Sequence, residues 1–143
     1  MSKHHRNRNW APAPQPLPED AHVIDNHTHV ASVVPFSQAM SHEAMEKGQG
    51  EVPVYSVDEL LEQAQKVGVE GVIDCGCELP NLRTAIDMAR EHPGTVHAAI
   101  AIHPNEAVLH GHRGAPGPDG LPIKYKPWHD IPFDEAMAEV HRL

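Results

Sequence analysis

Short apolar segments alternate with amphipathic helical segments in the middle of the chain, and this alternation constrains the fold more than any other feature. The strand-like segments are 21–25, 69–76 and 96–102, and the helical ones are 56–68 and 80–92. Strands that alternate with helices of about this length form parallel βαβ units with right-handed crossovers. The sequence therefore predicts an α/β fold with three parallel strands.

Residues at the ends of the two helices support their boundaries. Ser56 and Glu59 form a capping box, and Gly68 suits the left-handed conformation that ends many helices. Pro80 suits a first helical turn because its missing amide is not needed there, and Gly94 follows the second helix. Both helices are therefore predicted from their caps as well as from their periodicity.

Other parts of the chain read as irregular. We expect a disordered, proline-rich leader over 1–20 and one ordered domain over 21–143. Within that domain, 31–54 is predicted to be an irregular excursion in which 38–47 could hold a helical turn or two. A long irregular loop is predicted over 108–133, and a loop of this length is often functional or an insertion.

The third strand and the last helix suggest an unfinished architecture. Segment 96–102 is nearly all apolar, so we expect it to be buried on both faces. A last helix is predicted from about Asp134, and its apolar pattern continues to Leu143 without a cap. We expect the chain to be truncated rather than a complete small α/β domain.

Composition narrows the classes of function. The chain of 143 residues has 20 acidic and 11 basic residues, for a formal net charge of −9. A broad basic surface that coats nucleic acid is excluded, so contact with a phosphodiester needs another positive charge, such as a metal ion. The chain has no apolar run long enough for a membrane span and no secretory signal. We therefore expect a soluble, cytoplasmic protein without a membrane partner.

The sharpest local motif is Asp25-Asn26-His27-Thr28-His29, at the carboxyl end of the first predicted strand. In an extended backbone His27 and His29 share a face, so their imidazoles can converge on one ion. Asp25 would point the same way and could orient an imidazole or bind the metal itself. This spacing can arise by chance in a chain with 13 histidines, but its place at a strand end favours a metal site.

A second group of candidates follows the third predicted strand. His103 would open onto the same sheet edge as His27 and His29, where it could bind metal, hold a phosphate oxygen or shuttle a proton. The alternative is a histidine that only hydrogen-bonds the end of the strand. Glu106 is a further candidate carboxylate.

The two cysteines and the basic residues of segment 110–113 each have a structural interpretation as well as a functional one. Cys75 and Cys77 could be thiolate ligands of a metal, but we expect them to be a pair of buried small residues. His110, His112 and Arg113 could form a basic loop over a phosphate or a mobile polar loop. The motifs of P-loop nucleotidases, serine hydrolases and zinc ribbons are absent.

Three segments together resemble the TatD family of metal-dependent deoxyribonucleases. They are 23–29 (VIDNHTH), 68–76 (GVEGVIDCG) and 98–107 (AAIAIHPNEA), and both their order and their spacing agree with the family. The H-x-H motif alone is unspecific, whereas its combination with I-H-P-N-E-A is fairly specific. The resemblance covers about 22–107 and, more weakly, 134–143.

The resemblance implies a fold, a site and a reaction. The fold is a TIM (β/α)8 barrel, of which this chain would supply about the first three βα units. The family's D-x-H-x-H motif implies that His27 and His29 are ligands of a divalent ion, whether zinc, manganese or magnesium. Its G-x-H-P motif matches 101–104, with Ala101 in place of the usual glycine, and implies that His103 is a catalytic residue facing the substrate. The implied reaction is hydrolysis of DNA through the bound metal.

Departures from the family pattern bear on activity. The G-E-x-G-L-D strand, whose glutamate bridges the metals, is absent, as are the later histidine ligands and the late acidic motif. We therefore expect the N-terminal half of the barrel, with little or no activity by itself. Two other hypotheses stay open: a metallo-dependent hydrolase acting on a small phosphoester or amide, and a non-catalytic remnant or interaction module with structural histidines.

Overall fold

The computed structural model describes residues 18–48, 53–117, 120 and 122–143. Its elements in chain order are β1 (Val23–Thr28), α1 (Val30–Glu46), α2 (Val57–Lys66), β2 (Val69–Gly76), α3 (Leu79–Glu91), β3 (Val96–Ile100), α4 (Pro104–Ala107), the 3-10 helix η1 (Pro127–Asp130) and α5 (Phe133–Arg142). Except for its last three residues, the predicted leader 1–20 lies outside the described residues.

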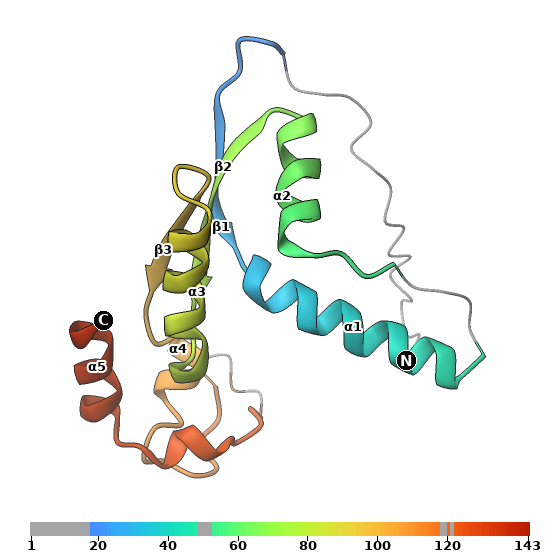
Figure 1. Ribbon diagram of the computed structural model, residues 1–143. Helices are drawn as coiled ribbons and strands as arrows, with labels where there is room; N and C mark the ends of the chain where they lie inside the picture. The colour runs from blue at the N-terminus through green and yellow to red at the C-terminus, as the bar shows by residue number, and fades with distance from the viewer. Residues whose placement is uncertain (1–17, 49–52, 118–119, 121) are drawn as a thin grey trace.

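The three strands form one parallel sheet in the order β1-β2-β3, with helices between them (Figure 1). The prediction of an α/β fold with three parallel strands is therefore confirmed. Because the strands are parallel, their carboxyl ends lie at one edge of the sheet, which we call the carboxyl edge. The residues that follow β1 and β3 thus emerge at the same edge, on either side of β2.

Helices cover one face of this sheet. One core cluster joins α2, β2, α3 and β3 through Leu61, Val72, Met88 and Val96. A second cluster joins α3 and α5 to the chain after β3 through Leu82, Ile102 and Ala136. The side chains of β2 alternate accordingly, and Val72, Asp74 and Gly76 are the buried residues towards its carboxyl end.

The expectation that segment 96–102 is buried on both faces is wrong. Val96 is buried, but His97, Ala98 and Ala99 are exposed. β3 is an edge strand of a sheet with one covered face, so an apolar sequence does not suffice to bury it. Ile24 on the other edge strand is 56% exposed for the same reason.

The expectation of an irregular excursion over 31–54 is also wrong, because residues 31–46 belong to the 17-residue helix α1. Pro35 lies inside this helix, where its ring removes one intrahelical hydrogen bond without ending the helix. The usual start signals are missing: His29 at the N-cap makes no capping side-chain bond, and the first turn has no acidic residue. A side chain from β2 stabilises this end instead, as described below.

The predicted boundaries of the two middle helices agree with the structure, whereas β1 runs from Val23 to Thr28 rather than over 21–25, and β3 ends at Ile100 rather than at residue 102. The capping box of Ser56 and Glu59 starts α2, and Gly68 follows it with a φ of +94°. α3 begins at Leu79 with Pro80 in its first turn, and Gly94 after it has a φ of +83°. Both glycines adopt the left-handed backbone that other residues rarely take.

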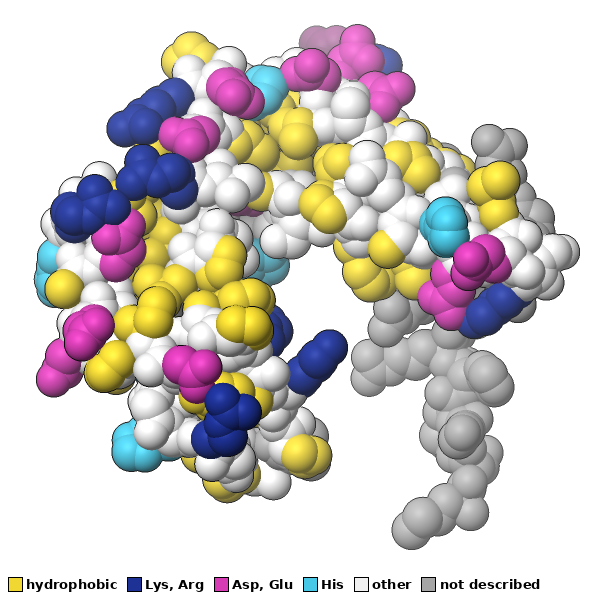
Figure 2. Space-filling view, turned by 60° about the horizontal axis from the view of Figure 1, so that its bottom comes forward, with side chains coloured by type: hydrophobic (Ala, Val, Ile, Leu, Met, Phe, Trp, Pro, Cys, Tyr) yellow, Lys and Arg dark blue, Asp and Glu magenta, His cyan; other side chains and the backbone are white. Residues whose placement is uncertain are grey.

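The chain between α4 and α5 packs partly inside the molecule. In the described parts of 108–133, Leu109, His110 and His129 are buried, and one bridge joins Pro116 to Pro122. Figure 2 shows the surface hollowed between α1 and this part of the chain. Among the described residues, no helix has the length and apolar character needed to cross a bilayer.

Candidate functional site

His27 and His29 lie side by side at the carboxyl edge. His27 belongs to β1 and His29 is the N-cap residue of α1, so both mark the point where strand passes into helix. Their ring centroids are 5.1 Å apart in an edge-to-face arrangement, and both residues are exposed. The structure therefore brings together the two histidines predicted to bind metal, in a place that solvent and ions reach.

Side-chain hydrogen bonds to β2 hold the end of β1 in place. The Thr28 hydroxyl donates to the Ile73 carbonyl at 3.0 Å, and His29 Nδ1 lies 3.0 Å from the Cys75 carbonyl oxygen. A carbonyl oxygen can only accept, so Nδ1 carries the proton in this bond and Nε2 of neutral His29 has a free lone pair. A ring nitrogen in this state is the form in which histidine binds a metal ion.

Asp74 is a buried acid next to these histidines. Only 1% of it is exposed, and its Oδ1 accepts a hydrogen bond from the Ala31 amide at 3.3 Å. Burial raises the pKa of Asp74, and hydrogen bonds from the Ala31 and Val30 amides, together with the nearby His29, partly oppose this rise. The carboxylate thus meets the free amides at the start of α1, where the positive end of the helix dipole lies.

Asp25 contacts the backbone of its own strand. Its Oδ1 accepts from the His27 amide at 3.1 Å, and the β1–β2 register shifts between Asp25 and Thr28. This hydrogen bond from the His27 amide to the Asp25 carboxylate thus helps to fix the backbone conformation at His27. Its predicted role as an orienting group or a ligand stays a prediction.

His103 lies after β3, two strands away from the histidine pair. Its amide bonds to the Cys77 carbonyl at 2.9 Å, and its Nδ1 accepts from the Asn105 amide at 3.1 Å. The exposed ring of neutral His103 therefore carries its proton on Nε2 and can donate a hydrogen bond there. Two strand spacings, about 10 Å, separate the backbones of β1 and β3, and within the described residues His103 is not part of any group of three or more side chains placed to hold one metal ion.

The described residues contain no group of three or more histidine, cysteine or acidic side chains placed to hold one metal ion. His27 and His29 fit a divalent ion as a pair of nitrogen ligands, because imidazole suits zinc and other first-row metals. Such a pair leaves the remaining coordination positions to water or substrate.

A buried polar network includes Glu106, three residues after His103, and Glu106 is its only member that the sequence pattern indicated as a candidate. Glu106 Oε2 is 2.5 Å from His129 Nε2, and His129 is fully buried. The Lys126 amide donates to His129 Nδ1 at 3.0 Å, so the His129 proton on Nε2 points at the Glu106 carboxylate. Lys126 Nζ bonds to Glu78 at 2.7 Å, which ties the 108–133 segment to the start of α3.

Of the remaining candidates from the sequence, His110 and Arg113 have structural partners, whereas His112 is exposed. Cys75 and Cys77 are free, half-buried thiols. His110 is buried with Nδ1 2.8 Å from the Ile131 carbonyl, so it does not belong to an exposed basic loop. Arg113 pairs with Asp130 at 3.0 Å and covers the Tyr125 ring.

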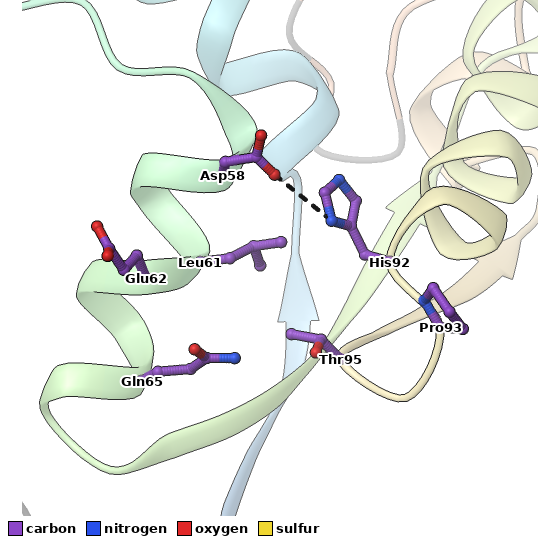
Figure 3. Close-up of a pocket in the computed structure, with 7 residues that line it drawn as sticks. All are labelled: Asp58, Leu61, Glu62, Gln65, His92, Pro93 and Thr95. Carbon is purple, nitrogen blue, oxygen red and sulfur yellow. Dashed lines mark ion pairs between the residues drawn. The ribbon is translucent and has the colours of Figure 1, made fainter.

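Two of the cavities in the described part of the chain are lined by residues of the helices, and Ala31, two residues after His29, lines one of them. One, of about 200 Å³, lies between α2 and the turn before β3, where Asp58 and His92 form an ion pair at 3.6 Å (Figure 3). The other, of about 370 Å³, is lined by side chains of α1, α2 and α3, including Val34, Val57 and Met88. None of the predicted site residues lines either cavity.

Comparison with known protein families identifies a match over most of the chain. The family model of the TatD related DNases matches residues 24–129, which is most of the chain and includes the histidine pair, His103 and Glu106. No curated protein and no solved structure matches the chain.

Proposed function

Because the chain belongs to the TatD related DNase family of metal-dependent hydrolases, we propose that the carboxyl edge of its sheet serves the hydrolysis of DNA phosphodiesters. The three parallel strands with their helices are accordingly part of a TIM barrel. Sites of such barrels form at the carboxyl ends of the strands, which is where the histidine pair lies.

The adjacent imidazoles of His27 and His29 are the observation that carries this proposal. His29 has its Nδ1 bonded to a backbone carbonyl and its Nε2 free, and both rings are exposed. These two residues would hold a divalent ion, which would supply an acidified water and positive charge against the phosphate. This positive charge is what a chain with a net charge of −9 otherwise lacks at a phosphodiester.

His103 suits the binding of a phosphate oxygen at the same edge. Its Nε2–H is directed by the hydrogen bond that Nδ1 accepts from the Asn105 amide. We expect it to donate to a non-bridging oxygen of the substrate, two strands away from the ion. This assignment gives His103 a catalytic role without making it a metal ligand.

An ion held by only two histidines keeps most of its coordination positions for water, so we expect weak metal binding and little hydrolysis by this chain alone.

The free thiols of Cys75 and Cys77 suit the reducing cytoplasm. Hydrolysis of a small phosphoester or an amide, rather than DNA, is the alternative outcome of the activity test.

Calorimetric titration with Zn²⁺ or Mn²⁺ tests the metal site. We expect weak uptake by the chain and none by H27A/H29A. The matched control is H42A/H141A, which removes two exposed histidines elsewhere. Equal uptake by all three proteins would contradict the site.

Hydrolysis is measured on a DNA oligonucleotide and on bis(p-nitrophenyl) phosphate, each with excess protein and Mn²⁺. Any cleavage is expected to be slow, to require metal and to disappear in H27A/H29A and H103A. Cleavage that persists in chelator would contradict the proposal, and cleavage of the small ester alone would replace DNA as the substrate.

A further inference from the structure

The start of α1 has an unusual cap. His29 at the N-cap makes no side-chain capping bond, and the first turn has no acidic residue of its own. The Ala31 amide in that turn donates instead to Asp74, which comes from the neighbouring strand β2. A carboxylate from a neighbouring strand therefore satisfies a first-turn amide of a helix that begins directly after His29.

The contacts around His29 form a continuous set. Thr28 donates to the Ile73 carbonyl at 3.0 Å, His29 Nδ1 bonds to the Cys75 carbonyl at 3.0 Å, and Ala31 donates to Asp74 at 3.3 Å. Three successive residues of β2, 73–75, thus accept hydrogen bonds from the segment 28–31, which contains His29. Of these three bonds, only the one to Asp74 uses a side chain of β2.

Asp74 is an acidic side chain in a buried position of β2. It is 1% exposed in a strand whose neighbouring buried positions are apolar or glycine. A buried carboxylate is costly unless it is hydrogen-bonded, so its presence requires a compensating partner. The partners shown are the first amides of α1, next to His29.

We propose that Asp74 is the positioning residue of the histidine pair: by accepting the first-turn amide of α1, it holds His29 with Nδ1 on the Cys75 carbonyl and Nε2 free for a metal ion. This inference rests on the proposed function for its metal, but the geometry of His29 can be tested without any metal. An oxygen acceptor is what the position requires, so asparagine should replace aspartate and an apolar residue should not.

The test uses the ¹⁵N-labelled, metal-free chain and reads the His29 tautomer from long-range ¹H–¹⁵N correlations, with H29Q for assignment. The variants are D74A, D74L and D74N, and the control is D87A, which removes an exposed acid from α3. We expect the Nδ1–H tautomer of His29 in the wild type, D74N and D87A. In D74A and D74L we expect a shift towards the Nε2–H tautomer that free histidine favours.

Zn²⁺ affinity is measured on the same proteins, and we expect D74A and D74L to lose about 10-fold or more. An unchanged His29 tautomer in folded D74A or D74L would overturn the inference, as would a D74N variant that behaves like D74A. Loss of the whole fold in D74A and D74L, with D74N intact, would show that Asp74 supports the sheet rather than His29, and would also overturn it. If the wild type binds no Zn²⁺ while the tautomers follow this order, the proposed function fails and the positioning by Asp74 stands.

Discussion

Buried polar side chains gather near the carboxyl edge, and each has a partner from another part of the chain. Asp74 meets the start of α1, and Glu106 meets His129 from the 108–133 segment. Burying such groups is tolerated only when hydrogen bonds or charges compensate for lost water. These residues therefore determine how the segments around the candidate site are joined, and replacing one should leave its partner buried without compensation.

Glu106 gives the clearest residue-scale prediction for stability. E106A leaves His129 and Lys126 without the carboxylate they share, in a place where Glu106 has only 10% of its side chain exposed. We expect a loss of about 3–5 kcal/mol in the free energy of unfolding, as for other broken buried pairs. Urea denaturation measures this loss. The control D87A breaks an exposed pair with Arg90 and should cost at most about 1 kcal/mol. Equal losses in the two variants would show that the Glu106 network is not stabilising.

Cys77 should be less reactive than an ordinary exposed thiol. Burial raises the pKa of Cys77, and the nearby Cys75 and Glu78 add to this rise. Thiolate is the reactive form, so Cys77 needs a higher pH than an ordinary thiol with a pKa of 9.0. Iodoacetamide alkylation of C75A, in which Cys77 alone remains, should reach half its maximal rate above pH 9.0. A midpoint below pH 9.0 would contradict the burial of this thiol.

At the scale of elements, helices and strands that carry their own signals were predictable, and those stabilised from elsewhere were not. α2 has its capping box and Gly68 within its own sequence, so both of its ends follow from local residues. α1 contains Pro35 and has no local start signal, because its cap is Asp74, more than forty residues later in the chain. β3 has the composition of a buried strand but lies at the edge of the sheet, which only the arrangement of its neighbours determines.

The contact between β2 and α3 depends on a glycine. A Cβ atom on Gly76 would lie 3.0 Å from both the Asn81 carbonyl oxygen and the Leu82 Cα atom, which belong to the backbone of α3. G76A should therefore push α3 away from the sheet and cost about 1–3 kcal/mol of stability. G71A is the matched control, because its nearest contact would be 3.3 Å away. Thermal unfolding should show a larger drop in Tm for G76A than for G71A, and the reverse order would contradict this close approach.

At the scale of the whole molecule, the strand–helix alternation and the placement of His27, His29 and His103 at one sheet edge were readable from the sequence. Parallel strands place their carboxyl ends together, so the residues after them are brought to one edge without any knowledge of side-chain packing. The Asp74 and His129 contacts could not be read in this way, because each joins distant segments. An acid within the apolar strand VIDCG was a signal for Asp74, since such a residue needs a buried partner.

The location of a bound ion tests the central claim most directly. Crystals of the chain soaked in Zn²⁺ or Mn²⁺ can be measured at the absorption edge of the metal, where anomalous scattering shows the ion alone. We expect a peak between the His27 and His29 rings, about 2.0–2.2 Å from Nε2 of His29. A peak only elsewhere, such as the Asp58–His92 cavity, with none at the histidine pair, would contradict the assignment of the carboxyl edge as a metal-dependent site.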